Sequence, residues 1–196
     1  MKSKKNLNRF IKLKQLTVLM KIIKYFLSIF LINSLRFLKI FPNNDPIMSA
    51  LLPFSKQDKW IHSMLFPLIA MISFDLITFK VGYWTIGTAL TYSFIGLMIH
   101  FYLRNRKASM KTYFGLGVAG ILFFDLVTGV IMGPMLFGQN FWIALLGQIP
   151  FTLLHLASGT LYIALITPFL DKHIIASKNL EDSKVLFYLK NLFKAK

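Results

Sequence analysis

The sequence predicts an all-α integral membrane protein with about six transmembrane helices. Three observations support this prediction. Hydrophobic residues make up 56% of the 196 residues and the mean hydropathy is +0.60, both far above the values usual for soluble domains. The run 126–170 contains no Asp, Glu, Lys or Arg, although a single bilayer crossing needs only about 20 apolar residues. A second run without these residues covers 81–103.

Apolar runs between charged and turn-forming residues define the individual helices. We expect six of them, at 16–41, 46–56, 61–79, 82–103, 113–133 and 140–170. The second is too short for a full crossing and is expected to be a half-span, a tilted helix or a helix broken at Pro53. The last is too long for one crossing at about 1.5 Å per residue. We therefore expect Pro150 to kink it or to separate a short re-entrant piece.

The basic residues predict the orientation of this membrane domain (16–171). The formal net charge is +16, and Lys and Arg concentrate in two terminal segments, 1–15 and 172–196, and in the loop 104–111. Such segments mark the cytoplasmic side, so both termini of a multi-pass protein in the cell membrane are expected to be cytoplasmic. Both terminal segments mix Lys with Leu and Ile, which is typical of amphipathic segments that lie along a membrane face or dock a partner protein.

Two cations of the first predicted helix do not follow this distribution. Arg36 and Lys39 fall near the outer end of the first predicted helix, where long basic side chains can snorkel toward the interface. Anionic lipid headgroups are a sufficient partner for the remaining basic charge, and no nucleic-acid partner is expected.

The sequence contains little that would support catalysis, metal binding or cofactor binding. Cysteine is absent, which excludes disulfides and thiolate metal sites. No two of the four histidines have the spacing of metal ligands, and neither an H-E-x-x-H pair nor a G-x-S-x-G turn is present. We therefore expect no enzyme activity, no metal and no cofactor.

Two aspartates stand inside apolar segments and are the first candidate functional residues. Asp75 lies in "SFDLITF" and Asp125 lies in "FFDLVTG". Both fall in the outer half of their helices, where Trp84, Asn140 and Gln148 are also expected, with Gln148 at the depth of Asp125. Because intramembrane carboxylates usually face a bundle interior or water, these five residues predict a substrate-binding cavity open to the outside.

Other interpretations of the same residues remain open. Each aspartate precedes a threonine by three residues, so Asp75 with Thr78 and Asp125 with Thr128 could be local polar pairs that hold helices together. The two acids could also belong to a proton or cation relay. Trp84 and Trp142 could both belong to an interfacial aromatic belt. His155, deep in the last helix, is expected to be a packed neutral side chain.

Three segments together resemble the substrate-binding S components of energy-coupling factor (ECF) transporters. They are "FPNNDPIMSALLPF" (41–54), the apolar helix that ends near Asp75, and "GQIPFTLLHLASGTLYIALITPFL" (147–170). Asn43 and Pro46 match an Asn-x-x-Pro turn of that family, and Gly147 and Pro150 match the Gly-x-x-Pro start of its last helix. The Ala-x-x-x-Ala stripe that contacts the coupling subunit in the family is absent between 16 and 41.

The resemblance implies an S-component-like bundle of six helices that captures a small, vitamin-like nutrient for import. It also implies docking on an ECF coupling subunit that carries paired ABC ATPases. Two rivals remain: a structural or assembly protein whose acids only pair helices, and an ion or proton pathway.

Overall fold

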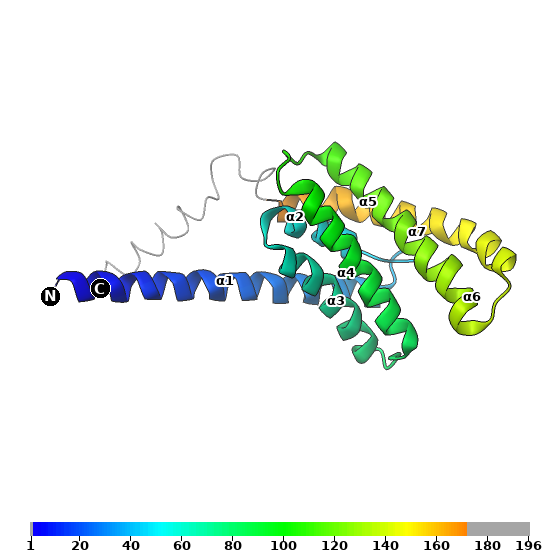
Figure 1. Cartoon of the computed structure of the whole chain (residues 1–196), viewed down its shortest axis with the longest axis horizontal. Coiled ribbons are helices and arrows are strands. Elements are labelled where there is room, and N and C mark those ends of the chain that lie inside the picture. The colour runs from blue at the N-terminus through cyan, green and yellow to red at the C-terminus, as the bar shows by residue number, and fades with distance from the viewer. Residues whose placement is uncertain (1, 172–196) are drawn as a thin grey trace.

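The computed structural model describes residues 2–171, and within them the chain is helical apart from turns and short loops (Figure 1). The predicted all-α class is therefore confirmed. The elements in chain order are α1 (Lys2–Leu38), α2 (Ile47–Gln57), α3 (Trp60–Ile77), α4 (Tyr83–Leu103), α5 (Met110–Asp125), the π-helix η1 (Leu126–Ile131), α6 (Met132–Phe137) and α7 (Phe141–Leu170). The amphipathic terminal segment predicted at 172–196 lies outside the described residues.

Four helical segments are long and apolar enough to cross a membrane. They are Trp60–Ile77, Tyr83–Leu103, Met110–Phe137, which joins α5, η1 and α6, and Phe141–Leu170. Many of their large apolar side chains are exposed, and only 28–50% of each span is buried inside the protein. This pattern fits lipid contact around the bundle, because acyl chains solvate apolar side chains as well as a protein interior does.

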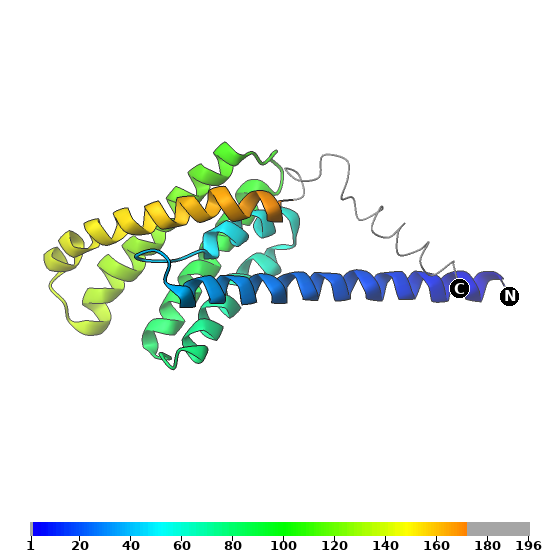
Figure 2. The ribbon, with the colours of Figure 1, turned by 180° about the vertical axis from the view of Figure 1, so that it is seen from behind.

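The first predicted helix begins earlier than the sequence suggested. α1 runs without a break from Lys2 to Leu38, so no change of secondary structure separates the basic segment 1–15 from the residues that follow. Its N-terminal part projects beyond the other helices in both views (Figures 1 and 2). The part near the bundle packs on α3, where the Arg36 guanidinium lies 4.1 Å from the ring centre of Phe74.

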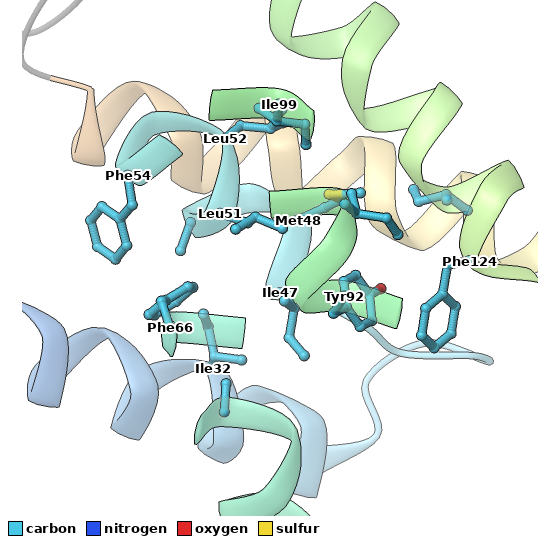
Figure 3. Close-up of a cluster of buried hydrophobic side chains, with 14 of the residues drawn as sticks. Ile32, Ile47, Met48, Leu51, Leu52, Phe54, Phe66, Tyr92, Ile99 and Phe124 are labelled. Carbon is cyan, nitrogen blue, oxygen red and sulfur yellow. The ribbon is translucent and has the colours of Figure 1, made fainter. Parts of the chain in front are cut away.

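The short helix α2 is the centre of the fold. Every residue from Ile47 to Ser55 is buried, and α2 packs against α3, α4, α5 and α7. At 11 residues it is about 16 Å long, half of a bilayer core, so the half-span interpretation of the second helix fits its length. Figure 3 shows the apolar side chains of α2 among those of its neighbours, including Ile32, Phe66, Tyr92, Ile99 and Phe124.

Pro53 does not break α2, and its missing N–H group is compensated from another helix. A proline removes the hydrogen bond to the carbonyl four residues earlier, which here is Ser49. The Thr167 hydroxyl of α7 donates to that carbonyl oxygen at 2.8 Å. Because both groups are buried, this bond satisfies a main-chain acceptor that would otherwise be unpaired and fixes α2 against α7.

The long last helix is also unbroken. α7 covers Phe141–Leu170 with Pro150 and Pro168 inside it, so the predicted separation of a re-entrant piece at Pro150 is wrong. The carbonyl that Pro150 leaves without its N–H partner belongs to Leu146, an exposed residue in the second turn.

Polar contacts place the ends of several helices together. Lys56 at the end of α2 donates to the main-chain oxygens of Leu103, the last residue of α4, and of Arg106 in the turn that follows. Gln57 donates to the Leu170 carbonyl at the end of α7, and Lys24 of α1 pairs with Asp58 at 3.3 Å. We call this the basal end of the bundle. The α3–α4 and α6–α7 turns form the opposite, distal end.

Candidate functional site

A cleft of about 760 Å³ opens between α4, the η1–α6 segment and the first half of α7 at the distal end. Three of the five predicted site residues, Trp84, Asn140 and Gln148, line it. Its other lining residues are Thr128, Gly129, Gly133, Phe137, Gln139, Ile143, Ala144, Gly147 and Phe151. The lining combines aromatic rings, amides and one hydroxyl, and it includes no charged side chain.

Two glycines make room for the amides on one wall. A Cβ atom on Gly129 would lie 1.8 Å from Oε1 of Gln148, and one on Gly133 would lie 2.9 Å from Oε1 of Gln139. Gln148 also donates from Nε2 to the Thr152 hydroxyl at 3.2 Å. The absence of side chains at 129 and 133 therefore lets two carboxamides lie against the helix backbone.

The backbone of that wall is a π-helix. η1 covers Leu126–Ile131 directly after Asp125, and the N–H of Met132 donates to the carbonyl of Val127, five residues earlier. π-Helical turns are uncommon and occur often at functional sites, because the extra residue widens the helix and turns its side chains. Thr128 and Gly129 reach the cleft from this segment.

The aromatic residues of the distal end divide into two groups. Trp84 contacts Phe137 across the cleft, with ring centres 6.1 Å apart. Trp142 is 66% exposed and does not line the cleft. Its position agrees with the aromatic belt expected at a membrane interface, whereas Trp84 is shared between the surface and the cleft.

Asp125 is buried beneath the cleft and does not line it. Its Oδ1 lies 2.8 Å from Nδ1 of His155, and the two side chains are 2% and 3% exposed. A carboxylate oxygen accepts the Nδ1 proton, and Nε2 is then the ring nitrogen on the side of Asp45. The interpretation of His155 as a residue with packing contacts alone is therefore incomplete, because it pairs α7 with α5. The local pair with Thr128, one of the alternatives left open by the sequence, is not formed, since that hydroxyl donates to the Phe124 carbonyl.

The pair continues into a larger buried polar cluster. Nε2 of His155 lies 3.9 Å from Oδ2 of Asp45, which accepts a hydrogen bond of 2.7 Å from the Tyr92 hydroxyl. Oδ1 of Asp45 accepts from the main-chain N–H of Ile47 at the start of α2. Neither Nε2 of His155 nor Oδ2 of Asp125 has a hydrogen-bond partner among the described residues. The cluster therefore joins α4, α5 and α7 to the loop before α2.

That loop, residues 39–46, is held by side-chain contacts at several points. Asn43 donates from Nδ2 to the Phe151 carbonyl, and the Ser158 hydroxyl donates to the Asn43 carbonyl at 2.9 Å. Asn44 bonds both the Leu35 carbonyl and the Tyr162 hydroxyl. The Asn-x-x-Pro turn is thus fixed to α7 above the N-terminus of α2.

Asp75 does not line the cleft, and its hydrogen bonds do not connect it to this cluster. The Thr85 hydroxyl donates to its Oδ2 at 2.6 Å, and the main-chain N–H of Gly82 donates to the same threonine oxygen. Thr78, the alternative partner that the sequence offered, donates instead to the Phe74 carbonyl of its own helix. Asp75 therefore joins α3 to α4 next to their turn, as expected for an acid that pairs helices.

The sequence did not identify Asp45, Tyr92 or His155 as parts of one site. For His155 the cause is the predicted end of the fifth helix at Gly133, whereas the helical segment ends at Phe137. Asp125 is therefore about twelve residues, or roughly 18 Å, below the distal turn, close to the depth of His155. Measuring both positions from the centre of the turn at 138–140 would have aligned them.

Within the part of the chain that the structure describes, no group of three or more His, Cys, Asp or Glu side chains has the arrangement of a metal site. In comparisons with known proteins, no protein-family model, no curated protein and no solved structure matches this chain.

Proposed function

We propose that this chain is a membrane-embedded substrate-capture subunit that imports a small vitamin-like nutrient through an ECF-type transporter, without catalysis of its own. The observation that supports this proposal best is the distal cleft of about 760 Å³ with Trp84, Asn140 and Gln148 in its lining. Cavities of roughly 300–1,000 Å³ with aromatic walls and a few polar groups are typical of small-molecule sites.

The composition of the cleft suggests how the ligand would be recognised. Trp84 and Phe137 offer apolar faces to a ring, and the amides of Gln139, Asn140 and Gln148 offer both donors and acceptors. Asp125 would then act indirectly, through two groups. One is the helix turn that carries Thr128, and the other is His155, which Asp125 contacts and whose ring centre lies 6.1 Å from that of Phe151 in the cleft wall. This role differs from the direct ligand contact expected from sequence.

The proposed function requires that the distal end faces outward. In this proposal all six helical segments belong to the membrane bundle, and the basal end with both termini is cytoplasmic, where Arg104, Arg106 and Lys107 follow α4. Single cysteines at Asn105→Cys and Lys80→Cys would be unique in this cysteine-free chain. An impermeant thiol reagent added to intact cells should label only Lys80→Cys. Labelling of both variants, or of Asn105→Cys alone, would contradict this orientation.

A binding experiment tests the function itself. The full chain, purified in mild detergent, should retain a small ligand detectable by mass spectrometry of the denatured protein. Gln148→Leu should reduce its occupancy by about tenfold, the loss expected for one or two buried hydrogen bonds. Trp84→Ala should also reduce it, whereas Trp142→Ala, at an exposed tryptophan of the same end, should not. Equal occupancy in all variants would exclude the cleft as the binding site.

A proton pathway is the second candidate function. It is favoured by the buried chain Tyr92–Asp45–His155–Asp125, in which one nitrogen and one carboxylate oxygen have no hydrogen-bond partner among the described residues. Such chains are typical of intramembrane proton relays. Proteoliposomes containing a pH-sensitive dye would show proton entry that His155→Phe abolishes. No proton flux above that of protein-free liposomes would leave nutrient capture as the preferred function.

A further inference from the structure

Outside the distal cleft, the structure has a second pocket with polar lining residues, of about 520 Å³, at the junction of α1 and the loop 39–46. Arg36, Lys39, Asn43, Asn44 and Phe74 are among its lining residues, and the lining includes no acidic residue. We call it the Arg36 pocket. It shares no lining residue with the distal cleft.

The guanidinium of Arg36 is positioned by uncharged groups. Its carbon lies 4.1 Å from the centre of the Phe74 ring, and Nη1 donates to the sulfur of Met71 at 3.2 Å. No carboxylate lies within ion-pair distance of Arg36 among the residues that the structure describes. Stacking on a ring leaves the edge of the guanidinium, with its N–H donors, free to bind an anion.

The helix dipole does not account for this cation. Basic residues at a helix C-terminus can be stabilised by the last free carbonyls. In α1, however, the Leu35 carbonyl accepts a hydrogen bond from the Asn44 side chain, and the recorded contacts of Arg36 are with Phe74 and Met71. Lys39 follows the helix with a left-handed backbone, φ 48°, at an exposed position.

The pocket lies in the distal half of the bundle, from which the long side chains of Arg36 and Lys39 can snorkel toward the headgroups of that side. Lys24 and Tyr25 mark the basal end through their bonds to Asp58, and Lys39 lies about 15 residues, or roughly 22 Å, farther along the chain toward the distal end. Below the pocket, α1 and α3 form a groove lined mainly by apolar side chains, including Phe30, Phe37 and Ile77, which suits an acyl chain.

We propose that the Arg36 pocket binds a phosphate group, with Arg36 and Lys39 as its cationic ligands. The continuous apolar groove favours the phosphate of an anionic lipid whose acyl chain follows α1 and α3. A soluble phosphate would be recognised by the same groups, because an arginine edge and an ammonium group suit phosphate oxygens irrespective of the rest of the molecule. This site is independent of the proposed nutrient cleft.

Lipid binding to the full chain in detergent tests the proposal. Native mass spectrometry with added dioleoyl phosphatidylglycerol should show binding about tenfold tighter than with dioleoyl phosphatidylcholine, the effect of one or two charge-assisted bonds. Arg36→Gln and Lys39→Gln should remove that preference. Lys80→Gln, which removes an equal charge from an exposed site at the distal end outside the pocket, should retain it.

The outcomes distinguish a lipid phosphate from a soluble phosphate, and both from the absence of a phosphate site. If inorganic phosphate raises the melting temperature of the wild type but not of the two variants, and the lipids are not distinguished, the source is a soluble anion. Lys39→Gln keeps the proposal testable if Arg36→Gln fails to fold, because the lysine side chain is exposed. The proposal is overturned if both variants bind like the wild type, or if Lys80→Gln loses as much binding as they do.

Discussion

Nδ1 of His155 lies 2.8 Å from Oδ1 of Asp125, and the two side chains connect α7 to α5 in the buried interior. This contact joins two residues that are 30 positions apart in sequence and sit at similar depths on either side of the α6–α7 turn. It gives the intramembrane aspartate a specific partner, and it places an imidazole between Asp125 and Asp45.

The first prediction concerns this pair. Asp125→Leu should destabilise the protein by about 2 kcal/mol, because the buried N–H of His155 loses its acceptor. Asp125→Asn retains a carbonyl oxygen at that position and should cost less than half as much. With His155→Phe, the double-mutant cycle should give a coupling energy of about 1–3 kcal/mol, measured by reversible unfolding in mixed detergent micelles. Additive effects would show that the contact contributes nothing specific.

The second prediction compares two threonines near Asp75: Thr85 of α4, which donates to it, and Thr78, which follows it in the chain. Thr85→Val removes the hydroxyl that donates to Asp75 and should cost about 1 kcal/mol, in the range of interhelical hydrogen bonds in membranes. Thr78→Val is the matched control, since its hydroxyl bonds only a carbonyl of its own helix and its loss should be nearly neutral. Equal costs for the two substitutions, measured by the same unfolding assay, would contradict a structural α3–α4 contact.

The third prediction concerns the glycine beneath Gln148. In Gly129→Ala the new methyl group would overlap Oε1 of Gln148, so the amide must leave its position on the cleft wall. Because the obstructing atom ends a flexible side chain, the melting temperature should change little, while retained ligand falls by about tenfold. Gly115→Ala is the control, since nothing lies within 4 Å of its added Cβ; it should keep the ligand and stabilise the helix by about 0.5–1 kcal/mol. Full ligand retention in Gly129→Ala would show that Gln148 does not bind it.

Much of the fold follows from features that can be read in the sequence without a structure. Uncharged apolar runs determine the helices, and the short interval between Pro46 and Asp58 determines that α2 cannot cross a bilayer. Trp84, Asn140 and Gln148 were placed at one end because each follows a predicted turn by a known number of residues, and they line one cleft.

The rotation of each helix about its axis could not be obtained in this way. The π-helix after Asp125 turns the following side chains by an amount that no sequence periodicity indicates. Tyr92 lies between Thr91 and Ser93, and neither neighbour marks Asp45 as its partner. Asp45 falls between the first two predicted helices, 16–41 and 46–56, so its position in the sequence indicates only a loop residue. Its role depends on the burial of the start of α2, which is a tertiary effect.

The last prediction concerns Pro53 and the residue that compensates for it. Thr167→Val should cost about 1–3 kcal/mol, because the buried Ser49 carbonyl loses the hydroxyl donor that α7 supplies to it. In Pro53→Ala the restored N–H can donate to the same carbonyl within α2, so Thr167→Val should cost at least about 1 kcal/mol less in that background. Thr160→Val provides the control, because its hydroxyl bonds carbonyls of its own helix and its effect should be the same with proline or alanine at position 53. Unfolding in detergent measures all of these variants. If the cost of Thr167→Val is independent of residue 53, the threonine stabilises α7 by packing alone, and the buried carbonyl must be satisfied by another group.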